Sequence, residues 1–211
     1  MREEDAARDS ALVAKAKQSP EAFGLIFDIY YSKILSYALR RVGDAEAAQD
    51  ITAEVFAKAF RAIKHYRSRG APFASWLYRI AGNEVKMFYR RPRRHTSLEV
   101  LTEAGFDVKS EALEEREQLQ ELVERDAQFA HAMAALRTLP MRYQEAIVLR
   151  YIEEKEIVEI AQILLCREGS VRSLLSRGLS KLRVALEAPL QQKPGERITT
   201  NEAQGILSAL K

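Results

Sequence analysis

The chain has 211 residues, with 33 lysines and arginines against 30 acidic residues, so its formal net charge is +3. Its single cysteine, Cys166, excludes a disulfide framework and a zinc site built from several cysteines, and its three histidines share no spacing typical of metal ligands. No stretch approaches the roughly 18 continuous apolar residues of a membrane span, and the charged N-terminal MREEDAARDS lacks the apolar run of a secretory signal, so we expect a cytoplasmic protein without membrane insertion.

The first strong helix signals lie between residues 19 and 63. Ser19 followed by Pro20 is typical of a helix start, and the predicted helix ends near Val42 because Gly43 follows. Asp44 can cap a second helix, predicted to run to residue 63. This second helix carries two adjacent apolar stripes, one of Ala48, Ile51, Val55, Ala59 and Ala62 and one of Phe56, Phe60 and Ile63. A helix with two such stripes packs against two neighbours, so residues 20–90 are predicted to form a helical bundle.

A third helix is predicted over residues 73–91, after a loop that contains Gly70 and Pro72 and before Pro92. One side of it combines an indole, an amide and cations at steps of three and four: Trp76, Arg79, Asn83, Lys86 and Arg90. The opposite side is apolar: Leu77, Ile80, Ala81 and Phe88. Glu84 falls among these apolar positions, and the pattern gives no reason for it. The polar stripe fits nucleic acid, because cations hold phosphates and an indole can stack on an unpaired base; the alternative is a solvated basic face.

Charge is distributed unevenly along the chain. Residues 61–94 hold ten basic side chains against one acid, residues 99–126 hold ten acids against three bases, and residues 167–183 hold five bases against one acid. Both basic blocks can neutralise phosphates, with a binding strength that would fall steeply with salt. The acidic segment has two interpretations, a functional linker and a flexible tether that stays extended by self-repulsion. Helical spacing from about Ser110 onward predicts that at least half of it is ordered.

Two short amphipathic segments within residues 146–186 meet at a sharp corner. The apolar positions of the first are Ile157, Ile160, Ala161 and Leu164, and those of the second are Val171, Leu174, Leu175, Leu179 and Leu182. Only Leu165, Cys166 and Arg167 separate them. This layout is typical of a helix-turn-helix, whose second helix lies in the major groove of DNA; the alternative is an ordinary helical hairpin. Cys166 is expected to be a small buried apolar residue rather than a redox or metal-binding one.

Four segments together resemble the extracytoplasmic-function sigma factors, the minimal two-domain initiation factors of bacterial transcription. They read DAEAAQDITAEVFAKAF, FASWLYRIAGNEVKMFYRR, ALRTLPMRYQEAIVLRYIEEKEIVEIAQI and REGSVRSLLSRGLSKLR, and the resemblance covers residues 20–94 and 128–187. It implies an all-α fold of two helical domains joined by an acidic linker, the second domain being a helix-turn-helix. The implied boundaries are 1–94 for sigma domain 2, 95–127 for the linker, 128–188 for sigma domain 4 and 189–211 for a C-terminal extension.

The resemblance also implies a role for each matched surface. Core RNA polymerase would dock on the face of the second helix that carries Asp50, Glu54 and Lys58, a face that is otherwise interpreted as merely solvated. The minus-ten element would be bound and melted by Tyr66, Arg67, Trp76, Arg79, Asn83, Lys86, Arg90 and Arg91. The minus-thirty-five duplex would be bound by Arg167, Ser170, Arg172, Ser173, Ser176 and Arg177. The implied partners are core RNA polymerase, promoter DNA in duplex and melted form, and an anti-sigma protein.

Motifs for catalysis are absent from the sequence, which has no phosphate-cradling glycine loop, no paired catalytic carboxylates and no nucleophile motif. We therefore expect neither an enzyme nor a cofactor or metal, with catalysis left to the polymerase. Two alternative functions stay open. A stand-alone helix-turn-helix regulator would bind duplex DNA without polymerase, whereas a helical adaptor or sigma mimic would not depend on DNA at all.

Three features depart from the family pattern. Leu165 stands where the turn before the recognition helix commonly has glycine. Because a left-handed backbone costs leucine about 1–2 kcal/mol, we expect a turn of different geometry. Met87 takes the place of a frequent acidic residue in the minus-ten helix, which leaves the promoter preference open. The tail 189–211 lies outside the resemblance and is interpreted either as a regulatory or partner-binding extension or as a frayed end.

Overall fold

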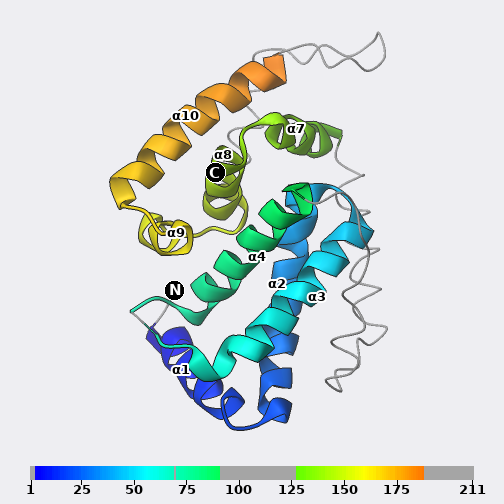
Figure 1. Ribbon diagram of the computed structural model, residues 1–211. Coiled ribbons are helices and arrows are strands. Elements are labelled where there is room, and N and C mark those ends of the chain that lie inside the picture. The colour runs from blue at the N-terminus through cyan, green and yellow to red at the C-terminus, as the bar shows by residue number, and fades with distance from the viewer. Residues whose placement is uncertain (1–2, 69, 91–126, 188–211) are drawn as a thin grey trace. The chain divides into compact units, whose positions relative to one another are not determined.

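The computed structural model describes residues 3–68, 70–90 and 127–187, and every regular element in these ranges is a helix (Figure 1). The chain divides into two units: the N-terminal unit contains α1 to α4, and the C-terminal unit contains α7, α8, α9 as far as Ala161, and α10. The predicted all-α fold of two helical domains is confirmed. The predicted linker up to residue 126, the predicted extension 189–211 and Arg91 lie outside the described residues.

Helices of the N-terminal unit begin and end where cap residues stand. Ser19 Oγ accepts a hydrogen bond from the N–H of Ala22 at 3.4 Å, and Asp44 Oδ1 accepts from the N–H of Ala47 at 2.8 Å. Gly43 follows the last residue of its helix with a φ of 71°, which glycine adopts without steric cost. The elements are α1 (Glu3–Ala16), α2 (Pro20–Val42), α3 (Ala45–Ala62), the 3-10 turn η1 (Ile63–His65) and α4 (Phe73–Arg90). The predicted start and end of α2 and the predicted start of α3 are confirmed, and α3 ends at Ala62, one residue before its predicted end.

The core of the N-terminal unit lies between α2, α3 and α4, each of which contacts the other two. Aromatic rings join α2 to α3: the ring centroids of Phe27 and Phe56 are 4.9 Å apart, and those of Phe23 and Phe60 are 5.1 Å apart. α3 therefore packs against two neighbours, as its two apolar stripes predict. The fully buried side chains of α4 include Leu77, Tyr78, Ala81 and Val85, whereas Ile80 and Phe88 are half-buried.

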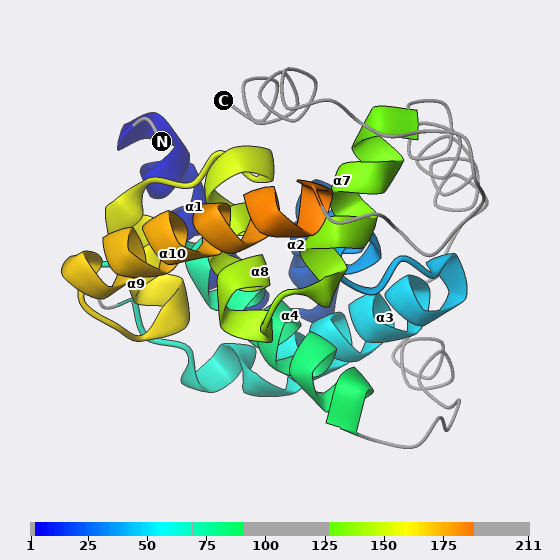
Figure 2. The same ribbon diagram turned by 90° about the horizontal axis from the view of Figure 1, so that it is seen from above.

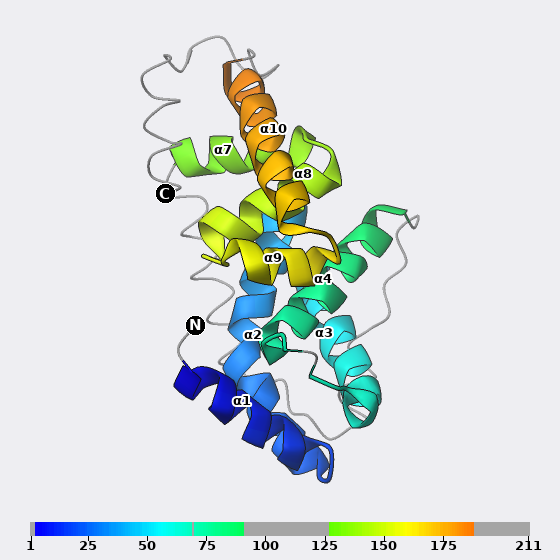
Figure 3. The same ribbon diagram turned by 90° about the vertical axis from the view of Figure 1, so that its left-hand side faces the viewer.

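Helix α1 was not predicted from the sequence, and it adds a fourth helix to the predicted bundle of residues 20–90. It packs along α2 and also contacts α4 (Figure 3). Val13 and Ala16 are buried in this contact, and the hydroxyl of Tyr30 in α2 donates to Asp9 Oδ2 at 2.6 Å. An isolated helix of 14 residues is marginal in water, because most helical stability comes from tertiary packing. Packing against α2 therefore supplies the stability that the local sequence of α1 does not provide.

The C-terminal unit is built around its last helix, which packs against two others (Figure 2). Its elements are α7 (Ala127–Thr138), α8 (Met141–Ile147), the π-helical turn η2 (Val148–Ile152), α9 (Ile157–Leu164) and α10 (Glu168–Glu187). α9 begins with a capping box, in which Glu159 Oε2 accepts from the N–H of Glu156 at 3.1 Å. Of the predicted apolar positions of α9 and α10, five are buried, namely Ile160, Ala161, Val171, Leu175 and Leu182. The other four are half-buried, namely Ile157, Leu164, Leu174 and Leu179.

Leu165, in the turn between α9 and α10, has the left-handed backbone conformation that glycine commonly adopts. Leu165 has a φ of 53° and a ψ of 48°, so the expectation of a different turn geometry is wrong. The N–H groups of Leu165 and Cys166 both donate to the carbonyl of Ala161, the latter at 3.0 Å. The Leu165 side chain is 73% exposed. The path that the two helices impose on the backbone therefore outweighs the cost of about 1–2 kcal/mol for leucine.

Replacing Leu165 by glycine is expected to raise the free energy of unfolding of the C-terminal unit by roughly 0.5–1 kcal/mol, because relief of the left-handed strain exceeds the added chain entropy. Urea unfolding of the full chain measures this effect. Val184→Gly is the matched control, since Val184 is also an exposed aliphatic residue but has a helical backbone. It should lower stability. A loss of stability in Leu165→Gly would contradict the proposed strain.

Alanine substitutions at two glycines of α10 are expected to change the free energy of unfolding in opposite directions. A Cβ at Gly178 would lie 3.0 Å from Cδ1 of Ile147 and 3.3 Å from Cβ of Tyr143, whereas a Cβ at Gly169 would meet no atom within 4 Å. We expect Gly178→Ala to lower the free energy of unfolding by about 1 kcal/mol, because overpacking exceeds the gain in helix propensity. Gly169→Ala should raise it by roughly 0.5 kcal/mol. Urea unfolding with hydrogen exchange of α10 amides checks both, and equal stabilisation would contradict close packing of α8 on α10.

Candidate nucleic-acid interface

Aromatic rings gather where η1 leads into α4. The ring centroid of Tyr66 lies 4.9 Å from that of Trp76 and 5.3 Å from that of Phe73, and Phe73 in turn lies 5.4 Å from Trp76 and 5.8 Å from Tyr30. We call these four residues the aromatic cluster. Tyr30 and Phe73 are buried, whereas Tyr66 and Trp76 are half-buried. The cluster therefore offers two partly accessible rings on a buried aromatic base.

The phenol of Tyr66 stays protonated at physiological pH. Burial is the main cause that raises the pKa of Tyr66, and the carboxylate of Asp9 raises it further. A hydrogen bond with Ser68 and the charge of Arg79 act in the opposite direction. The ring thus presents a neutral face and a hydroxyl that can donate, which suits stacking with a nucleobase better than a phenolate would.

The polar stripe of α4 continues from the aromatic cluster along an unbroken helix. Asn83 and Arg90 are exposed and Lys86 is half-buried. Arg67 is exposed in the loop beside Tyr66. The structure brings the predicted minus-ten residues Tyr66 and Trp76 into direct ring contact, and it places the remaining described ones on the same helix or loop. Their contacts with DNA stay a prediction.

The predicted docking face on α3 contains an ion-pair network. Lys58 Nζ lies 2.6 Å from Glu84 Oε2 in α4 and 3.3 Å from Glu54 Oε1 one turn earlier in α3. The sequence pattern gave no reason for Glu84 among apolar residues, and this ion pair explains it. The Glu84 side chain is only 11% exposed, and the ammonium of Lys58 compensates its charge. Sequence reasoning missed the pair because the two residues lie in different helices.

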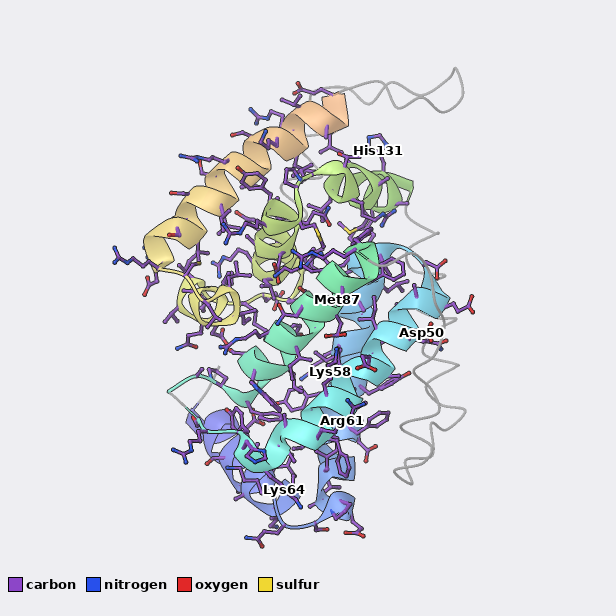
Figure 4. All side chains as sticks on the ribbon, in the orientation of Figure 1. Asp50, Lys58, Arg61, Lys64, Met87 and His131 are labelled. Carbon is purple, nitrogen blue, oxygen red and sulfur yellow. The ribbon has the colours of Figure 1, made fainter. Side chains whose placement is uncertain are left out.

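Asp50 and Lys58 of the docking face follow one another along α3, and Arg61 and Lys64 continue this line into η1 (Figure 4). Asp50 is half-buried, and Lys58 already has two carboxylates beside it. The face therefore changes from an acidic start to a basic end. Met87 of α4, which departs from the family pattern, is half-buried (Figure 4).

Five of the six predicted minus-thirty-five residues lie on the exposed side of α10, and Arg167 directly precedes this helix. All six are exposed: Arg167, Ser170, Arg172, Ser173, Ser176 and Arg177. The buried side of the same helix faces its own unit through Val171, Leu175, Gly178 and Leu182. The guanidinium of Arg172 donates to Glu168 Oε2 at 3.0 Å, and Ser173 Oγ donates to the carbonyl of Gly169 at 3.0 Å. Glu168 thus holds Arg172 in position on the surface, a pairing that the sequence analysis did not identify.

The environment of Cys166 does not indicate a redox or metal site. Cys166 is half-buried, less than the predicted burial, and burial raises the pKa of its thiol while the charge of Arg142 opposes this. In the described ranges, no three His, Cys, Asp or Glu side chains are arranged to hold a metal ion. Among the helices that the structure describes, none combines the length and apolar character that a membrane crossing requires.

Two sigma-70 family models match the two units separately. Sigma-70 region 2 matches residues 26–95, and Sigma-70 region 4 matches residues 132–182. The chain therefore contains region 2 and region 4 of the sigma-70 family, one in each unit.

Curated relatives cover most of the chain. The RNA polymerase sigma-H factor of Pseudomonas aeruginosa is 34% identical over 188 residues, which is 88% of this chain and 97% of the relative. The ECF RNA polymerase sigma factor SigW of Bacillus subtilis is 30% identical, over 81% of this chain and 91% of its own. The chain therefore belongs to the extracytoplasmic-function sigma factors, and it is an RNA polymerase sigma factor of transcription initiation.

A solved structure shows the same fold. It is the structure of CnrH in complex with the cytosolic domain of CnrY, with a TM-score of 0.59 and 23% sequence identity, and it covers 86% of this chain and 98% of the solved chain. The likeness concerns the fold alone.

Proposed function

We propose that the two units divide promoter recognition between them while core RNA polymerase supplies catalysis in the cytoplasm. The N-terminal unit docks on core polymerase through Asp50, Glu54 and Lys58 and opens the minus-ten element. The C-terminal unit binds the minus-thirty-five duplex through the exposed side of α10. The observation that carries this proposal is the ring contact of 4.9 Å between Tyr66 and Trp76 at the head of the polar stripe of α4, because a regulator of duplex DNA alone has no use for it.

The chemistry of the aromatic cluster supports promoter opening. Taking a base out of the stack costs a few kcal/mol, and stacking on an aromatic side chain returns about 1–3 kcal/mol per base. Tyr66 and Trp76 are accessible enough to accept a base, and the buried ring of Phe73 supports both. Cations along α4 then hold the phosphates of the separated strand, since charge contacts fix the backbone without selecting a sequence.

The surface chemistry of α10 supports duplex binding. Arginine forks bind guanine edges or phosphates in a bidentate way, and serine hydroxyls bind either kind of acceptor. Arg172 and Arg177 supply the forks, and Ser170, Ser173 and Ser176 supply the hydroxyls, all from one helix. The apolar side of that helix is buried in its own unit, so the polar side is left for DNA.

A role for the acidic linker and one further partner complete the proposal. The acidic linker, residues 95–127, is proposed to pass through a basic channel of the polymerase that otherwise holds nucleic acid, because ten acids against three bases between 99 and 126 mimic the charge of a nucleic-acid strand. An anti-sigma protein is proposed to cover the docking face around Asp50 and the recognition helix, since blocking either surface disables initiation. Affinity purification from the source cells that recovers no such partner would count against this second proposal.

Transcription with purified core RNA polymerase tests the proposed function. The template is a pool of promoter-length fragments, and the reaction is run with and without this protein. Initiation at discrete sites supports the proposal and reveals both promoter elements. Binding to duplex DNA of equal strength without core polymerase, combined with no initiation, would favour a stand-alone regulator. Binding to core polymerase with no DNA dependence would favour a sigma mimic.

A further inference from the structure

Helix α1 borders the aromatic cluster although it lies before the segment that matches Sigma-70 region 2, which starts at residue 26. Its Asp9 accepts the hydrogen bond from the hydroxyl of Tyr30, a member of the cluster, at 2.6 Å. The same carboxylate contributes to the raised pKa of Tyr66. Asp9, in the middle of α1, therefore contacts the cluster directly through the hydroxyl of Tyr30.

A cation from this end of the chain lies over the most accessible tyrosine of the cluster. Lys17 directly follows α1, and its backbone N–H still donates to the carbonyl of Val13 at 3.1 Å, so the helix fixes its position. Its Nζ lies 5.9 Å from the ring centroid of Tyr66. Tyr66 contacts Trp76 and Phe73 by its ring as well. The ammonium and the two aromatic rings thus surround the ring that we propose to receive an unstacked base.

We propose that Lys17 is a DNA-binding residue of the minus-ten site, supplied by α1; this inference rests on the proposed function. In the unbound protein the ammonium is held by the ring of Tyr66, a weak attraction at a partly exposed site. When a base stacks on Tyr66, the ammonium leaves the ring and binds the phosphate next to that base. A lysine suits this exchange, because its charge is a compact point on a flexible stem with three rotatable donors.

The test measures how strongly the sigma–core complex binds the non-template strand of the strongest promoter selected by the wild-type protein, at a series of salt concentrations. Lys17→Ala should reduce affinity roughly fivefold at moderate salt and should reduce the slope of log affinity against log salt by about 0.7, the value for one phosphate contact on a single strand. Lys17→Arg keeps the charge and should retain the wild-type slope. Lys15→Ala is the matched control, since Lys15 is an exposed cation of the last turn of α1 with the same change in charge.

The outcomes distinguish a DNA contact of Lys17 from a role in the stability of α1, from an effect of overall charge and from a failure of the proposed function. A wild-type slope and affinity in Lys17→Ala would overturn the inference while leaving the proposed function intact. An equal loss in Lys17→Ala and Lys17→Arg, with a lower melting temperature in both, would assign Lys17 to the stability of α1 and also overturn it. An equal change of slope in Lys15→Ala would reduce the effect to overall charge and overturn it as well. A wild-type protein that selects no promoter would overturn the proposed function first and this inference with it.

Discussion

Replacing Arg172 and Arg177 together by alanine is expected to weaken binding of the upstream promoter duplex by roughly 30-fold or more, because each well-placed arginine fork is worth about 1–3 kcal/mol. Both side chains are exposed on α10, and Glu168 holds the guanidinium of Arg172 at 3.0 Å. The measurement is a titration of the sigma–core complex with a duplex that carries only the minus-thirty-five element. If both arginines bind phosphates, the salt slope should fall by about 1.8 at the same time.

Lysine at both positions separates charge from geometry. The double variant Arg172→Lys and Arg177→Lys keeps two cations and should retain the salt slope, whereas loss of the planar fork should remove discrimination between bases. Substitutions of exposed side chains usually change stability by less than about 0.5 kcal/mol, so both double variants should melt like the wild type. Unchanged duplex binding by the alanine variant would contradict the assignment of this face to DNA.

Local signals in the sequence were sufficient to predict most of the helices. Ser19, Gly43 and Asp44 act through atoms within a few residues, so the ends of α2 and the start of α3 could be predicted without tertiary information. Helix α1 could not, because the buried side chains of Val13 and Ala16 gain their stability from packing against α2. The turn at Leu165 was predicted wrongly for the same kind of reason: a local steric preference yielded to the packing of the helices on both sides.

The sequence predicted which residues line the candidate site better than it predicted the contacts between them. Helical spacing identified the polar stripe of α4 and the polar side of α10, because residues three or four apart share a face. Pairs that join different helices could not be found this way. Glu84 and Lys58 are 26 residues apart, and Asp9 and Tyr30 are 21 apart, so no periodic pattern connects them. Lys17 over Tyr66 is the clearest case, since it depends on the packing of a helix that the sequence did not predict.

Replacing Trp76 by alanine is expected to reduce promoter opening by roughly 5- to 150-fold, which corresponds to the loss of one base–aromatic stack worth about 1–3 kcal/mol. The indole is half-buried and contacts the rings of Tyr66 and Phe73, so its removal also takes away the support of Tyr66. Binding to core polymerase and to the upstream duplex should persist, because neither depends on this ring. The measurement is the permanganate reactivity of unpaired thymines in the minus-ten region, compared with duplex binding by the same complex.

Two matched variants distinguish stacking from a loss of folding. Trp76→Phe retains an aromatic face and should recover most of the opening. Phe73→Leu changes a ring of the same cluster that is only 3% exposed, so it should lower the melting temperature and still open the promoter at temperatures where the chain is folded. If Trp76→Ala opens the promoter as well as the wild type does, the aromatic cluster has no part in melting. If Trp76→Phe is as defective as Trp76→Ala, the indole acts through a contact that another aromatic ring does not reproduce, and stacking alone is excluded.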